Sequence, residues 1–118
     1  MAARIDFVGT TSVSRNDGQV FVSNCPPNKT GLCFVGDAQG QVPFGNGVRC
    51  ATGQLLRVCT VHVGANGSAL GSYDLTTPQL AGNLVAGSSW NFQFMYRDPA
   101  AGGAAFNASD AMTVEFVP

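Results

Sequence analysis

The sequence predicts an all-β protein: a single domain over residues 1–118, folded as a two-layer antiparallel β-sandwich of jelly-roll or immunoglobulin-like type with about seven to nine strands. Three observations predict this fold. Aromatic residues recur at every second position from Trp90 to Tyr96, which is the period of a β-strand. The chain has 15 glycines, but residues that favour helices are scarce. Short apolar runs alternate along the chain with turns that contain glycine, asparagine or proline.

The expected strands follow from local alternation and from the turn residues between them. Pro26 and Pro27 predict a rigid loop, and Asn66-Gly67 is a strong hairpin signal. The polar, glycine-rich residues 37–46 are expected to form a loop that Phe44 anchors. In chain order, the expected strands cover residues 4–8, 19–23, 32–35, 48–50, 55–63, 69–75, 90–97 and 113–116.

The strand over residues 90–97 is expected to organise the core. Its aromatic face must be buried, because so many large rings on one face bury much apolar surface; this face carries Trp90, Phe92, Phe94 and Tyr96. The opposite face is expected to meet water or a ligand, and it carries Asn91, Gln93, Met95 and Arg97.

Charge and hydropathy exclude two classes of partner. The formal net charge is −1 and charged residues make up 11% of the chain, so no basic patch is expected to bind nucleic acid. The sequence contains no apolar run of the roughly 18 residues that a membrane-spanning helix needs.

The four cysteines favour disulfide bonds over a metal site. Their spacing lacks a C-x-x-C motif and the chain has one histidine, so a zinc site is not expected. Four cysteines allow three pairings; we favour Cys25–Cys33 and Cys50–Cys59, because each pair flanks an expected turn. Disulfides would place the chain in an oxidising compartment. The alternative is four buried free thiols.

Few residues suit catalysis. His62 lies in an expected strand without a neighbouring nucleophile motif, and we interpret it as structural. Most of the acidic residues adjoin glycine, asparagine or proline, as turn residues do, and no two are marked as a pair across a cleft. We therefore expect no enzymatic activity.

The segment after the aromatic strand has two interpretations. In the first, Arg97 pairs with Asp110 or Asp98 and fixes the long loop that follows. In the second, oxygens of Asp98, Asn107 and Asp110 bind Ca²⁺, which prefers six to eight oxygen ligands. No other cofactor is expected.

A glycan is the ligand that the polar face suggests. Asn91, Gln93 and Arg97 offer hydrogen-bonding groups, and Tyr73 and Phe44 are the aromatic residues left free to stack on a sugar. The strict alternation of the other aromatic residues favours a place in the core.

The string WNFQFMYRDP, followed by a glycine-rich gap and FNASD, resembles an uncharacterised module found at the C-terminal ends of large secreted or surface bacterial proteins. The segments NKTGL and VPFGNGVRC are also similar to that module. The resemblance covers most of the chain and implies an extracellular or cell-surface location and an accessory role.

Two functions are therefore expected from different classes. The first is a non-catalytic extracellular module that binds a glycan or another cell-surface component. The alternative is a self-associating structural subunit of a fibre or oligomer, since the chain has little charge and unprotected strand edges invite pairing.

Overall fold

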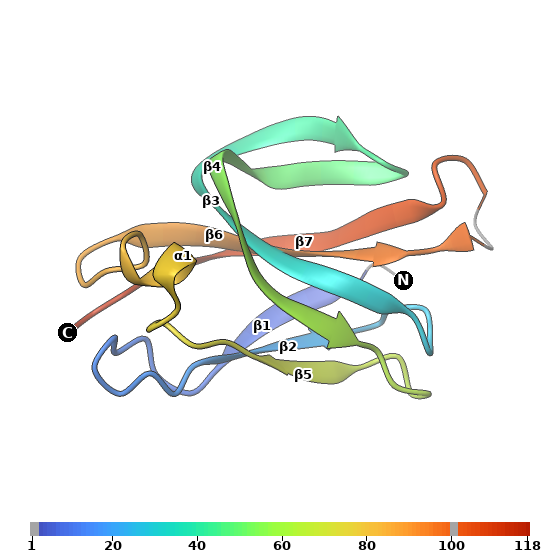
Figure 1. The fold of residues 1–118 in the computed structure, drawn as a ribbon. Helices are drawn as coiled ribbons and strands as arrows, with labels where there is room; N and C mark the ends of the chain where they lie inside the picture. The colour runs from blue at the N-terminus through green and yellow to red at the C-terminus, as the bar shows by residue number, and fades with distance from the viewer. Residues whose placement is uncertain (1–2, 100–101) are drawn as a thin grey trace.

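The protein is a β-sandwich, as the sequence predicts. A computed structural model describes residues 3–99 and 102–118, and within these residues seven strands form two antiparallel sheets, β1-β2-β5 and β4-β3-β6-β7 (Figure 1). The elements are β1 (Arg4–Val8), β2 (Gln19–Ser23), β3 (Thr30–Phe44), β4 (Gly47–His62), β5 (Ala69–Ser72), α1 (Pro78–Ala81), β6 (Ser89–Arg97) and β7 (Phe106–Glu115).

The strand order distinguishes between the two predicted topologies. The chain changes sheet after β2, after β4 and after β5, while β3–β4 and β6–β7 are hairpins within one sheet. A division into three and four strands with these crossovers is immunoglobulin-like. A jelly roll would have eight strands in two Greek keys.

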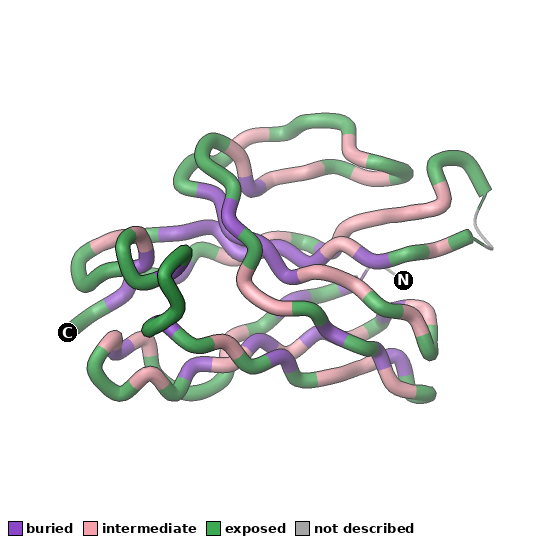
Figure 2. Tube along the Cα trace, viewed as in Figure 1, coloured by how far each residue is buried: buried purple, intermediate pink, exposed green. Residues whose placement is uncertain are grey.

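The aromatic face of β6 lies inside the sandwich, as predicted. Phe92 and Phe94 are fully buried, and Trp90 and Tyr96 are 5% and 6% exposed. The Phe92 ring lies 6.1 Å from that of Phe7 on the opposite sheet, measured between centroids. Figure 2 shows the buried segments concentrated where the two sheets face each other.

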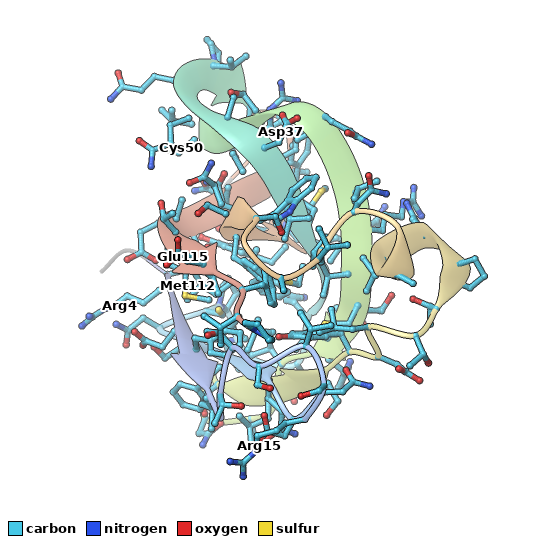
Figure 3. The ribbon with its side chains drawn as sticks, turned by 90° about the vertical axis from the view of Figure 1, so that its left-hand side faces the viewer. Arg4, Arg15, Asp37, Cys50, Met112 and Glu115 are labelled. Carbon is cyan, nitrogen blue, oxygen red and sulfur yellow. The ribbon has the colours of Figure 1, made fainter. Side chains whose placement is uncertain are left out.

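The prediction of a loop over residues 37–46 is wrong, because most of this stretch continues β3 and forms a hairpin with β4. The register shifts between Gly36 and Ala38 and again between Gln39 and Val42, and such bulges bend a strand pair. The distal hairpin, residues 37–53, therefore turns back over β6 and β7 (Figure 1). Figure 3 shows Asp37 and Cys50 on this hairpin.

Part of the polar face of β6 lies under the distal hairpin, which corrects the expectation that this whole face meets water or a ligand. Gln93 is fully buried. Its Oε1 accepts hydrogen bonds from the Cys50 and Ala51 amides at 2.9 and 3.3 Å. Its Nε2 donates to the carbonyls of Val48 and Ser109 at 2.9 and 2.8 Å. One side chain thus joins the hairpin to both β6 and β7.

Asn91 and Asn46 hold the hairpin at two further points. Asn91 is 6% exposed, and its Oδ1 accepts a hydrogen bond from Gln39 Nε2 at 3.2 Å. At the tip, the Asn46 amide donates to the Phe106 carbonyl at 2.8 Å, and Asn46 Oδ1 accepts from the Ala104 amide at 3.0 Å. The hairpin is therefore a third layer that covers part of the outer face of the four-stranded sheet.

The sequence did not predict α1. Pro78 occupies its first turn, where a missing amide hydrogen costs nothing, and Leu80 packs into the core. No helix in residues 3–99 and 102–118 has the length and hydropathy to cross a membrane.

Candidate functional site

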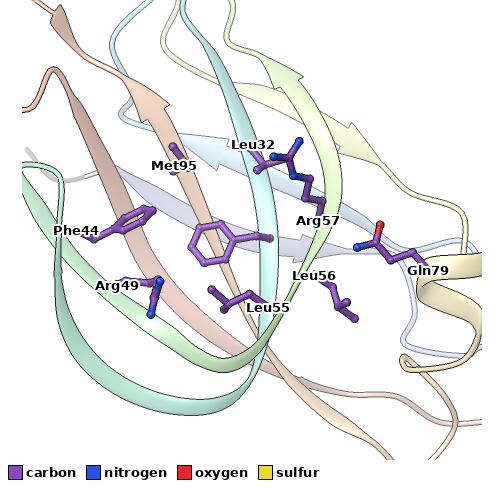
Figure 4. Close-up of a pocket in the computed structure, with 9 residues that line it drawn as sticks. Leu32, Phe44, Arg49, Leu55, Leu56, Arg57, Gln79 and Met95 are labelled. Atoms are coloured by element: carbon purple, nitrogen blue, oxygen red, sulfur yellow. The ribbon is translucent and has the colours of Figure 1, made fainter.

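The bend of the distal hairpin leaves a hollow on the outer face of the four-stranded sheet. It has a volume of about 300 Å³. Figure 4 shows side chains of β3, β4 and β6 around it, with Gln79 of α1 at one side. The lining residues are Leu32, Phe34, Phe44, Arg49, Leu55, Leu56, Arg57, Gln79 and Met95.

Strand register creates the floor of this hollow. Phe34 of β3 lies opposite Arg57 of β4, and Leu32 lies between Thr60 and Met95 of its two neighbours. Residues opposite each other in antiparallel strands share a face, so all five side chains lie on the outer face. The floor is therefore mainly apolar, with Arg57 beside it.

The distal hairpin supplies the wall. The Phe44 ring packs edge-on against Phe106 of β7 at 5.2 Å between centroids and lies 6.0 Å from Phe34. The Arg49 guanidinium lies over the same ring, 5.6 Å from its centroid. Phe44 thus packs the hairpin against the sheet, and its ring contacts Arg49 at the edge of the hollow.

A second hollow of about 430 Å³ adjoins the first and shares Leu32, Arg57 and Met95 with it. It continues toward the end of β6, where Arg97 and Thr30 line it. We call the two hollows together the outer groove. The groove extends over β3, β4 and β6 with Arg57 at the shared part.

The cations of the outer groove have no carboxylate partners. Within residues 3–99 and 102–118 the one ion pair is Arg15–Asp17, so Arg49, Arg57 and Arg97 are unpaired there. Arg49 Nε is also buried without a hydrogen-bond acceptor among these residues. Among the residues that the structure describes, no acidic side chain lines either hollow. The groove therefore combines an apolar floor with unpaired hydrogen-bond donors.

The structure separates the predicted glycan-binding residues. Asn91 and Gln93 are buried beneath the distal hairpin and use their amides for internal bonds, so their predicted role as a ligand-facing surface is wrong. Tyr73 packs against the core beside Phe7, and burial raises the pKa of its hydroxyl. Arg97 is exposed in the groove, and Phe44 lines it as well.

Two of the three predicted calcium ligands line one hollow. Asp98 and Asn107 line a hollow of about 420 Å³ near Tyr96, whereas Asp110 is not among its lining residues and its Oδ1 accepts the Ile5 amide of β1 at 2.8 Å. The described residues contain no group of three or more His, Cys, Asp or Glu side chains that could hold a metal. The alternative, an Arg97 ion pair with Asp98 or Asp110, is wrong, since the described residues form no such pair.

His62 lies at the end of β4 and is exposed. Its Nδ1 lies 3.0 Å from Thr30 Oγ1 on the neighbouring strand. The His62 ring therefore contacts a side chain of the neighbouring strand. Within the described residues it forms no ion pair with a carboxylate that could orient it.

The predicted disulfides Cys25–Cys33 and Cys50–Cys59 are wrong, because all four cysteines are free. Cys33 instead lies directly opposite Cys59 on β3 and β4. A hydrogen bond between these two thiols, with burial, raises the pKa of Cys33, and the same bond lowers the pKa of Cys59. Burial raises the pKa of Cys25 to about 11.

Sequence reasoning missed Arg49, Arg57 and Leu55 as site residues. A signal was present, since arginines are few in this chain and these two lie between apolar residues of one hairpin. Their shared location, however, depends on the bend of that hairpin.

No family model, curated protein or solved structure matches the chain. The site is therefore interpreted from its geometry alone, and the resemblance to a secreted bacterial module stays a prediction.

Proposed function

We propose that the chain is a non-catalytic, extracellular accessory module that binds carbohydrate in the outer groove. The observation that carries this proposal is the groove itself: an apolar floor of Leu32, Phe34 and Met95 with arginine donors along it. A sugar ring also combines apolar and polar surfaces, because its C–H groups form apolar faces and its oxygens lie around the edge. Apolar contact and a few directed polar groups are what ligand sites generally combine.

The side chains that line the outer groove support a binding role. General acid–base catalysis needs a titratable group within hydrogen-bond reach of the reacting atoms. Arginines supply the charge of the outer groove, and arginine does not lose its proton in proteins. His62 contacts Thr30 at the end of β4 and does not line the groove. The groove residues are thus suited to holding a ligand.

Two matched leucine variants test where a carbohydrate binds. Leu55 is 40% exposed and lines the groove, whereas Leu70 is 56% exposed on β5 of the other sheet. Leu55→Ser should weaken binding of a soluble polysaccharide about tenfold, since it removes one apolar contact. Leu70→Ser should leave it unchanged. Calorimetric titration of the purified protein against neutral and acidic polysaccharides measures both.

Two results of this titration would contradict the proposal. If no polysaccharide binds, the chain is not a carbohydrate module, and concentration-dependent oligomers in sedimentation would then favour the self-associating subunit. If Leu70→Ser weakens binding as much as Leu55→Ser, the outer groove is not the site. β4 and β7 are the edge strands of the four-stranded sheet, and such self-association would start at an edge strand.

An extracellular location has a consequence for Cys33 and Cys59. Residues directly opposite each other in antiparallel strands have Cα atoms about 4.5–5.5 Å apart, which is within the range that a disulfide spans. With oxidised glutathione as the oxidant, the Cys59 thiolate should attack first, because its pKa is the lowered one. Cys33 then displaces the bound glutathione; the two thiols lose two electrons and two protons, and two glutathione thiols form.

Peptide mass spectrometry after alkylation measures this pairing. We expect one Cys33–Cys59 linked peptide and a chain lighter by two hydrogens, with Cys50 still open to alkylation. Cys25 should react slowly at pH 8, because its pKa of about 11 keeps it a thiol. A Cys25–Cys33 link, or four free thiols after full equilibration, would contradict the expectation.

A further inference from the structure

We propose that the ligand of the outer groove is an acidic polysaccharide, a chain of sugars that carry carboxylates; this rests on the proposed function and specifies its ligand class. The chain has six lysine and arginine residues in all, and Arg49, Arg57 and Arg97 all line this groove. Arg57 lines both hollows, Arg49 only the first and Arg97 only the second. The positive charge therefore extends along the whole groove.

In the described part of the chain, no carboxylate pairs with this charge. The arginines form no ion pair within the described residues, and no aspartate or glutamate lines the groove. In a chain with 11% charged residues, such a row of like charges over an apolar floor produces a positive potential at one surface. An anionic ligand is the complement of that potential, which also increases the rate of encounter.

Arg49 points to a carboxylate more specifically. Its Nε is buried without an acceptor in the described part of the chain, and a buried donor without a partner is costly. Figure 4 shows its side chain between Phe44 and Leu55, at the wall of the first hollow. A carboxylate in the hollow would balance the charge of this guanidinium, and ion pairs between arginine and carboxylate are among the stronger interactions in proteins.

The position of the groove favours a polysaccharide over an acidic peptide. An extended peptide gains most by adding to the free edge of a sheet, where its backbone is paired. The groove instead lies on the face of β3, β4 and β6, whose backbones already pair with one another. Arginine donates hydrogen bonds and accepts none. Ring oxygens and carboxylates match these donors, whereas peptide N–H groups would find few acceptors.

The test compares charged and uncharged forms of one sugar chain. Calorimetric titration uses polygalacturonate, its methyl ester and poly-L-glutamate as probes. The variants are Arg57→Gln and, as a matched control, Arg4→Gln, because Arg4 is exposed on β1 of the other sheet and lies away from the distal hairpin (Figure 3). Thermal unfolding checks that both variants remain folded.

We expect polygalacturonate to bind at least about tenfold more tightly than its methyl ester, and more weakly as salt is raised. Arg57→Gln should lose about tenfold in affinity and Arg4→Gln should lose nothing. If the methyl ester binds as tightly as polygalacturonate and Arg57→Gln keeps its affinity, the ligand is not acidic. The proposed carbohydrate-binding function would not be contradicted by that result. If poly-L-glutamate binds more tightly than polygalacturonate, the ligand is an acidic polypeptide and not a polysaccharide. No binding to any saccharide would overturn the proposed function itself.

Discussion

Replacing Phe92 by alanine should lower the free energy of unfolding by about 3–5 kcal/mol, which is among the largest effects expected of a single substitution in this chain. Phe92 is fully buried on the inner face of β6. Its ring lies 6.1 Å from that of Phe7 and 6.2 Å from those of Tyr73 and Phe116, measured between centroids. Removing it leaves a cavity that both sheets border, and a packed core collapses only partly around such a cavity.

Urea denaturation of Phe92→Ala and of a control variant, Phe21→Ala, measures this loss. Phe21 lies in β2 and is half-buried, between the buried Val20 and Val22, so its ring points away from the sandwich interior. Its replacement should cost about 1 kcal/mol or less. If both variants lose the same free energy, the aromatic face of β6 is not the centre of the core.

Replacing Gln93 by leucine should lower the free energy of unfolding by about 2–4 kcal/mol, although leucine nearly fills the same volume. The amides of Cys50 and Ala51 and the carbonyls of Val48 and Ser109 each lose the hydrogen bond that the Gln93 side chain makes with them. These groups lie between the distal hairpin and the sheet, where apolar leucine offers no substitute. We expect the hairpin to detach before the sandwich unfolds.

Thermal and urea unfolding of Gln93→Leu and Gln41→Leu provide the matched comparison. Gln41 is exposed on the same hairpin, so its replacement should change stability by about 0.5 kcal/mol or less. Polysaccharide binding should weaken in Gln93→Leu only, because the groove loses its wall. Equal stability of the two variants would show that Gln93 does not hold the hairpin.

The inner half of the fold could be predicted because its signal is local. Alternation from Trp90 to Tyr96 fixes one face of β6, and four large aromatic side chains on one face require burial. The other face could not be assigned in the same way, since its polar residues are compatible both with contact to water and with a covering layer. The burial of Gln93 depends on Val48, Cys50 and Ala51, which lie more than 40 residues earlier in the chain.

The candidate site has the same dependence on long-range structure. Phe34 and Arg57 share a face only because the register shifts between Cys33 and Phe34, and a shift of one residue moves a side chain to the other face. The shift also affects the cysteines: pairing by the nearest turn predicts Cys50–Cys59, whereas the ladder places Cys59 opposite Cys33. Composition and alternation carry no information about the face that Phe34 and Arg57 share or about which cysteines lie opposite each other.

Amide hydrogen exchange at Cys50 tests the central structural claim, that the distal hairpin lies closed on β6 and forms the wall of the outer groove. Cys50 has no partner in the register between β3 and β4, and its amide donates to Gln93 Oε1 at 2.9 Å. If the hairpin is closed, the Cys50 amide should exchange on the order of a hundredfold or more slowly than a free amide in the natural chain, and rapidly in Gln93→Leu. Exchange at the rate of a free amide in the natural chain would contradict the third layer, and with it the groove and the binding role.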